Sequence, residues 1–157
     1  MGKIPNVTKS AAAFSLAALL ATACAGLQAE EGKALSLSGA SEVPPVTSAA
    51  KGSGQIMVGA DHSVSGSVTV SGFAPTAAHI HEAAAGKNGP VAVVLSKSGD
   101  NAFAVPPGTK LTDAQYASYE AGNLYVNVHS AEHPGGEIRV QLMPAAKASP
   151  PMRSGGY

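Results

Sequence analysis

Short runs of alternating apolar and polar residues, separated by glycine, proline and asparagine, constrain the fold of this chain more than any other feature. The 157 residues include 18 glycines and 11 prolines, which favours short elements joined by many turns. Alternation with a period of two residues is typical of half-buried β-strands. The pattern predicts about seven strands, at 34–38, 55–58, 63–70, 78–81, 91–95, 124–130 and 137–142. We therefore expect one all-β domain.

One segment departs from the strand pattern. Thr112, followed three residues later by Gln115, has the form of a capping box, and Gly122 is placed to end a helix. We expect one short helix here, in a crossover loop between strands. Short strands with Greek-key-sized gaps and one helical crossover favour a β-sandwich, or a flattened barrel of the same topology.

The two ends of the chain differ from its middle. Lys3 and Lys9 precede an apolar run at 11–25, which is typical of a secretory signal peptide and is short for a membrane-spanning helix. We interpret residues 1–29 as a signal peptide, 30–143 as the domain and 144–157 as a flexible tail. The alternative is processing before Cys24, which would make this residue the lipid anchor of a lipoprotein.

Charge and cysteine content narrow the function classes. Ten Lys and Arg balance ten Asp and Glu, so the sequence predicts no basic surface and no nucleic-acid partner. A single cysteine permits no intramolecular disulfide. We expect an exported protein, periplasmic or secreted, with no transmembrane span in the mature chain.

The histidines are the residues most informative about function. His79 and His81 are two residues apart in a predicted strand and therefore point to the same side. In the strand at 124–130, the side chains of Tyr125, Asn127 and His129 lie opposite an apolar face. In the strand at 137–142, the side chains of Glu137, Arg139 and Gln141 likewise lie opposite an apolar face. Each of these strands thus places polar groups on the side away from the core.

If the strands are neighbours, His79, His81 and His129 converge on the outer face of one sheet, and His133 in the following loop is a further candidate ligand. Three imidazole nitrogens with one open position suit Zn or Cu rather than Ca or Mg. The alternative is that His79 and His81 are merely solvated and that His129 holds a loop carbonyl with its ring N–H. His62 lies in a predicted hairpin turn and is expected to face solvent.

Five linked segments carry a resemblance to a known family. They are 37–46, 78–81, 86–91, 122–129 and 134–139. In this order, and over residues 35–142, the chain resembles the chordin-type (CHRD) domain. The resemblance implies a secreted immunoglobulin-like β-sandwich, found in bacteria as a stand-alone exported protein and in animal chordin as repeated modules of a growth-factor antagonist.

The resemblance also marks the family's recurrent His-Ile-His, Asn-Val-His and Gly-Glu-Ile-Arg motifs. Beside the histidines, these motifs contain Asn127, Glu137 and Arg139, which we expect to surround the ligands. Two roles are open for Arg139: a salt bridge to Glu137 or Glu82 on an exposed sheet, or a charge that attracts anions to the metal.

Three functions are compatible with these features. The first is a binding module that holds Cu or Zn, and the second is an adhesion or protein-interaction domain by analogy with chordin. The third is a metalloenzyme, because residues 79–82 and the Gly-rich loop after them are similar to the copper-binding strand of Cu/Zn superoxide dismutases. The chain lacks the disulfide cysteines and the zinc loop of those enzymes, and it has no nucleophile and base at catalytic spacing. We therefore favour a non-catalytic metal-binding module.

Overall fold

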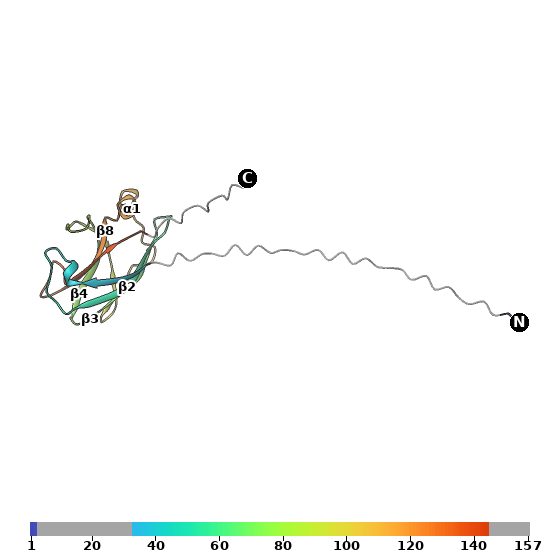
Figure 1. Cartoon of the computed structure of the whole chain (residues 1–157), viewed down its shortest axis with the longest axis horizontal. Coiled ribbons are helices and arrows are strands. Elements are labelled where there is room, and N and C mark those ends of the chain that lie inside the picture. Colours follow the sequence, from blue (N-terminus) through green and yellow to red (C-terminus); the bar gives the residue numbers. More distant parts are fainter. Residues whose placement is uncertain (3–32, 145–157) are drawn as a thin grey trace, which may run out of the picture.

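The computed structural model describes residues 1–2 and 33–144, and almost all of its regular structure is β-strand. The strands are β1 (Ala34–Ser38), β2 (Lys51–Val58), β3 (Val64–Ser71), β4 (Pro75–Glu82), β5 (Val91–Val94), β6 (Ser96–Gly99), β7 (Ala102–Ala104), β8 (Leu124–Ser130) and β9 (Ile138–Leu142). A short 3-10 helix η1 (Gly39–Ser41) follows β1, and the helix α1 (Asp113–Glu120) precedes β8 (Figure 1). The predicted all-β class is confirmed.

All nine strands belong to one antiparallel sheet in the order β5-β4-β8-β9-β1-β2-β3-β7-β6. The two halves of this sheet meet where β9 pairs with β1 through Arg139 and Ser38 alone. The two edge strands, β5 and β6, are separated in the chain only by Leu95, so the sheet is nearly closed into a barrel. This is the flattened-barrel variant of the predicted sandwich.

The sequence predicted seven of the nine strands and missed β6 and β7. Every residue of β6 is exposed, so the strand has no apolar alternation to reveal it. β7 has three residues, of which only Phe103 is buried. It pairs with β3 through Phe103 opposite Val68. Both strands therefore depend on pairing with a neighbour rather than on a pattern of their own.

The apolar core lies where the alternation placed it. Val64, Val68 and Val70 of β3 are buried, and the serines between them are not. On β8 the core face is formed by Leu124, Val126 and Val128, each fully buried.

The opposite face of β8 is not exposed, and here the expectation of an outer sheet face was wrong. Tyr125, Asn127 and His129 are all buried. Loops cover them: the Pro134 carbonyl accepts a hydrogen bond from His129, and the Gly135 carbonyl accepts one from Asn127. The polar face of β4, β8 and β9 is therefore a second interior, lined by polar groups.

The predicted helix is confirmed with its capping box. The Thr112 hydroxyl accepts a hydrogen bond from the Gln115 amide, and the Gln115 side chain accepts one from the Thr112 amide. Gly122 follows the helix with a φ of 73°, the left-handed conformation that commonly ends helices. α1 stands at the periphery of the strands in Figure 1.

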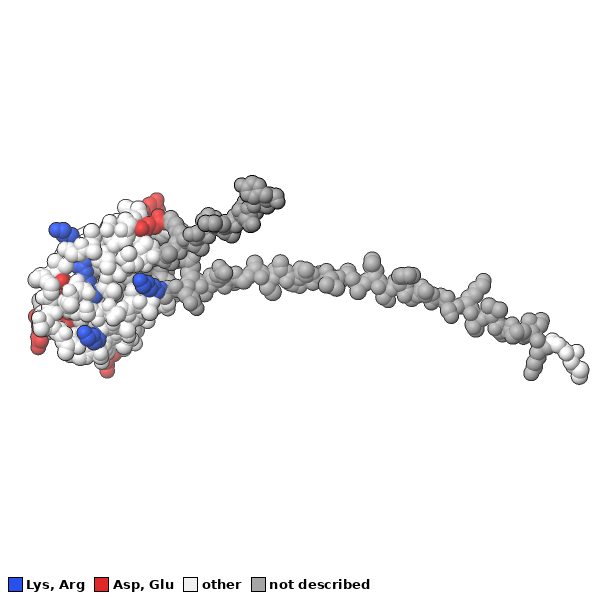
Figure 2. Space-filling model, in the orientation of Figure 1, with Lys and Arg blue, Asp and Glu red and all other residues white. Residues whose placement is uncertain are grey.

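Two features bear on partners and location. No helix within residues 1–2 and 33–144 is long and apolar enough to cross a membrane. The face shown in Figure 2 carries Lys, Arg, Asp and Glu as scattered side chains on a mainly uncharged surface. The predicted signal peptide with Cys24, and the tail from residue 145 onward, lie outside the described residues.

Candidate metal centre

The pairing of β4 with β8 brings three histidines together. His79 pairs with Asn127, and His129 pairs with Ala77, so His129 lies diagonally across from His79 on the same face. His81 pairs with Tyr125 one step further along. One nitrogen from each of the three rings lies within 4.8 Å of the others. Within residues 33–144, this is the group of histidines and acidic residues whose spacing suits a metal ion.

The hydrogen bonds of two of these rings define which nitrogen carries a proton. His81 Nδ1 lies 3.0 Å from the Gly89 carbonyl, and His129 Nδ1 lies 3.0 Å from the Pro134 carbonyl. A carbonyl only accepts, so both Nδ1 atoms carry a hydrogen and both Nε2 atoms present a lone pair when the rings are neutral. Backbone carbonyls that orient a ring in this way are the usual outer partners of metal-binding histidines.

The lone pair of His81 Nε2 has no partner. This atom is buried, and no hydrogen-bond donor from the described part of the chain reaches it. An unsatisfied buried polar atom costs free energy, about 1–3 kcal/mol in typical cases. In His129 the equivalent Nε2 lies 2.9 Å from His79 Nδ1, so a single hydrogen is shared between these two rings.

The surroundings favour the neutral form of two of the rings, His79 and His129. Burial lowers the pKa of His79 below the ordinary 6.5, and the neighbouring His129 and His81 lower it further. Burial also lowers the pKa of His129, against the effect of the hydrogen bond to Pro134, and His81 adds to the lowering. A neutral imidazole is the form that binds a metal, so these two rings are ready to bind one at neutral pH.

The dimensions fit a transition metal. Two nitrogens bound to one Zn at 2.0–2.1 Å in tetrahedral geometry are roughly 3.4 Å apart. The separations in the cluster, 2.9 Å between His79 and His129 and at most 4.8 Å overall, bracket that value. Imidazole ligands suit Zn or Cu, whereas Ca and Mg prefer oxygen.

His133, the fourth candidate, is not part of this group. Its Nε2 lies 3.7 Å from Glu137 Oε2, and the three-histidine cluster does not include it. His62 was expected to face solvent, but its ring stacks on Tyr116 with 4.1 Å between the ring centroids.

Tyr125 connects the cluster to Arg139. The His81 ring stacks on Tyr125 with centroids 5.0 Å apart and planes 8° apart. The Arg139 guanidinium carbon lies 3.3 Å from the Tyr125 centroid. Since β8 lies between β4 and β9, Tyr125 separates the metal-ligand candidate His81 from this cation.

Of the two roles open for Arg139, the salt bridge on an exposed sheet is wrong. The side chain is 2% exposed rather than on an open sheet, and its hydrogen bonds go to Asn88 and Gln141 instead of Glu137 or Glu82. A guanidinium over an aromatic ring, with planar hydrogen bonds at its edge, is well satisfied without a direct ion pair.

Asn127 and Glu137 have distinct positions around the cluster. Asn127 Nδ2 donates to the Gly135 carbonyl at 3.3 Å and so anchors the loop whose Pro134 holds His129. Glu137 accepts hydrogen bonds from Ser130, at 2.8 Å, and from Ser48. Its carboxylate contacts these serines and His133, and it lies outside the three-histidine group.

Several residues that shape the site were not on the predicted list. Tyr125, Gly89, Pro134 and Asn88 supply the stacking and hydrogen bonds described above, and Glu42 is a buried carboxyl beside Arg139. Tyr125 shares a strand face with Asn127 and His129, so its position was visible in the alternation. The others lie in loops, where spacing gives no direction.

The sequence profile of the CHRD domain matches residues 34–142. The chain belongs to the CHRD domain family. Searches of curated proteins and of solved structures found no match. The five segments that carried the resemblance are neighbours in this CHRD domain, as hydrogen bonds link Asn88 to Val43 and Arg139, His81 to Gly89, and His129 to Pro134. Membership in the family supports a β-rich binding module.

Proposed function

We propose that this CHRD domain is an exported binding module that holds one Cu or Zn ion with His79, His81 and His129. The observation that carries the proposal is the buried Nε2 of His81, which has a free lone pair and no hydrogen-bond partner among the described residues. Next to it, His79 and His129 share one hydrogen between two nitrogens. A bound cation would take the place of that hydrogen, which would move to His79 Nε2, and would accept a lone pair from each of the three rings.

The remaining residues would support such an ion without binding it. The carbonyls of Gly89 and Pro134 fix the orientation of two rings, and Asn127 holds the loop that carries one of these carbonyls. Three protein nitrogens leave one position open in a tetrahedral site. Export of the chain is part of the proposal and is supported by the signal pattern at 1–29.

Calorimetric titration tests the proposal. Protein freed of metal with a chelator is titrated with Zn(II) and with Cu(II), for the wild type, His81→Ala and His133→Ala. We expect one ion per chain in the wild type and in His133→Ala, because His133 lies outside the cluster. Loss of one of three ligands should weaken binding in His81→Ala by at least about tenfold, the lower end of the effect of altering even an outer partner.

Two results would contradict the proposal. Equal affinity in the wild type and His81→Ala would show that the ion binds elsewhere, and loss of binding in His133→Ala but not in His81→Ala would move the site to the Glu137 side of the domain. Electron paramagnetic resonance of the Cu(II) form gives an independent readout, with nitrogen couplings expected from the histidine ligands.

A further inference from the structure

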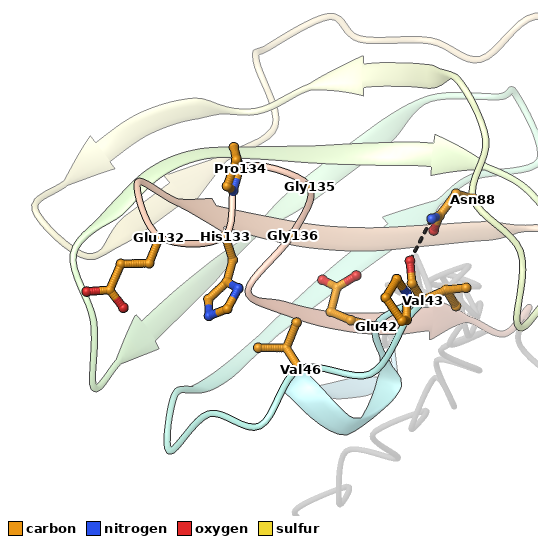
Figure 3. Close-up of a pocket in the computed structure, with 10 residues that line it drawn as sticks. Glu42, Val43, Val46, Asn88, Glu132, His133, Pro134, Gly135 and Gly136 are labelled. Atoms are coloured by element: carbon orange, nitrogen blue, oxygen red, sulfur yellow. Dashed lines mark hydrogen bonds between the residues drawn. The ribbon is translucent and has the colours of Figure 1, made fainter.

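A pocket of about 400 Å³ lies beside the histidine cluster, between the segment at 42–46 and the loop at 132–136. Figure 3 shows the two segments facing each other, with Asn88 closing one end through its hydrogen bond to the Val43 carbonyl. None of the three clustered histidines lines the pocket. The volume is in the range of pockets that take small organic ligands.

The carboxyl of Glu42 is the unusual feature of this pocket. The residue is 5% exposed, and its Oε1 has no hydrogen-bond partner in the described part of the chain. Figure 3 shows the carboxyl directed toward the middle of the lining residues. Gly136 allows this position, since a Cβ there would lie 2.5 Å from Glu42 Oε1.

Arg139 attracts the Glu42 carboxylate but donates its hydrogen bonds to other groups. Arg139 is engaged with Tyr125, Asn88 and Gln141. Glu137, the second buried carboxyl nearby, accepts its hydrogen bonds from serines, and Glu132 adds a further carboxylate to the lining.

Glu42 is poised to change its charge near neutral pH. Burial raises the pKa of Glu42 to about 7, against the attraction of Arg139 and a hydrogen bond from the Val43 amide, and Glu137 raises it further. A carboxyl with a pKa of about 7 changes its charge in this range, and a cation in the pocket would favour the ionised form.

The rest of the lining is suited to a short hydrocarbon chain. Val43, Pro44, Val46 and Pro134 present apolar surface next to the carboxyl. We propose that this pocket binds a primary ammonium group on a short apolar chain, with the ammonium on the Glu42 carboxylate and the chain against the valines and prolines. A lysine side chain of a partner protein and a free alkylamine share this chemistry. A Ca ion is a poorer fit because it requires six to eight oxygen ligands.

Binding of small probes to the full chain tests the proposal. The probes are n-butylamine, Nα-acetyl-lysine amide and the neutral n-butanol, followed by the amide NMR signals of Gly135 and Gly136. We expect saturable shifts in the millimolar range with the amines and none with butanol. Saturation by butylamine supports a free amine as the ligand, whereas saturation by the lysine derivative alone supports a lysine of a partner protein.

Variants locate the binding group. Glu42→Gln keeps the shape of the side chain and should abolish the shifts, whereas Glu132→Gln removes the other lining carboxylate and should retain them. The His133→Gln variant removes the imidazole that also lines the pocket.

The pH dependence tests the wild type independently, in case Glu42→Gln does not fold. Affinity for the amine should fall about tenfold from about pH 8 to about pH 6, because the ionised fraction of a carboxyl with a pKa of about 7 falls by that factor. The same fall is expected in His133→Gln. Absence of saturation with both amines, equal binding of butanol, or affinity independent of pH would each overturn the proposal.

Discussion

Glu42 and Arg139 carry opposite charges and are buried in the same region, but they differ in how many of their polar atoms have partners. Arg139 has a stacking partner in Tyr125 and hydrogen bonds to two side chains. One oxygen of Glu42 has no partner within the described residues, and burial is the main reason that its pKa is raised to about 7. Burial of the ionised carboxylate therefore lowers the free energy of unfolding of the domain above neutral pH.

This imbalance predicts how stability depends on pH at one residue. The folded-state pKa of Glu42, about 7, lies above the ordinary value of 4.5, so the folded state holds a proton more tightly than the unfolded state does. The contribution of Glu42 to stability is full below pH 4.5 and is lost as pH rises to about 7. Glu42→Gln has no such loss. Relative to this variant, wild-type stability should decrease by up to about 3 kcal/mol across that window.

Urea unfolding of both proteins at a series of pH values measures the difference. Taking the difference cancels the titration of the histidines, which is common to both chains. As a control, Asp100→Asn replaces an exposed carboxyl in the turn between β6 and β7 and should leave the pH profile of the wild type unchanged. A constant difference between wild type and Glu42→Gln from acid to alkaline pH would mean that Glu42 is not raised in pKa.

At the scale of elements, β2 and β3 form the longest paired ladder in the sheet, with eight residue pairs. Gly54 allows this close pairing, because a Cβ at this position would clash with the Ser67 carbonyl and lie 2.7 Å from Val68 Cα. These are backbone atoms, which cannot move aside as a flexible side chain can. Gly54→Ala should therefore lower the free energy of unfolding by about 2–4 kcal/mol.

Gly99→Ala is the matched control for this change. A Cβ at Gly99 would make only an ordinary contact of 3.5 Å with Ala102, so the cost should stay within about 0.5 kcal/mol. Thermal unfolding of the two variants gives the comparison. An equal loss of stability in both would indicate that glycine flexibility, rather than close approach, determines the residue at 54.

The capping box of α1 makes a local prediction. Thr112→Ala removes the oxygen that accepts from the Gln115 amide and should cost about 1 kcal/mol, whereas Thr112→Ser retains the oxygen and most of the stability. Amide exchange should become faster in α1 and stay unchanged in β2 and β3. Faster exchange throughout the domain would show that the helix supports the whole fold rather than its own first turn.

Prediction from sequence succeeded where a pattern acts over several residues of one element. Alternation placed Val64, Val68 and Val70 in the core, and Thr112 with Gln115 defined the start of the helix. The alternation correctly placed Arg139 on the polar face of its strand, but it did not predict that Arg139 is buried. Its burial depends on loops from other parts of the chain. The pattern of a strand reports which side a residue faces, but it carries no information on what covers that side.

At the scale of the whole molecule, the polar face of β4, β8 and β9 is covered by three segments far apart in sequence. The segment at 42–46 contacts Asn88 of the loop at 83–90, and the loop at 131–136 contacts His129 and Asn127. The near-closed order of the sheet brings these segments over one face. The three histidines could be assigned to the same side from their spacing, but the carbonyls that fix their proton positions could not, because loop conformation is set by these distant contacts.

The same arrangement predicts how metal binding would spread through the molecule. If an ion holds the three rings, the Gly89 and Pro134 carbonyls are held with them, so the loops at 83–90 and 131–136 should become more ordered. Zn(II) at about one hundred times its dissociation constant stabilises a folded domain by about 2.7 kcal/mol. Hydrogen exchange followed by mass spectrometry should then slow in the two loops, beyond any change in the β2–β3 hairpin, which β9 and β1 separate from β8 in the sheet order.

His81→Ala provides the control for this last experiment, because it retains both loops and lacks one ligand. Zn(II) should leave its exchange pattern nearly unchanged. Slowing of the same loops in His81→Ala, or slowing confined to β2 and β3 in the wild type, would contradict a metal centre between β4 and β8. The expected result, protection limited to the two loops, would show that metal binding at the histidines orders the segments that enclose the Glu42 pocket. Pro134 provides the link, because its carbonyl accepts from His129 and the residue lines the pocket.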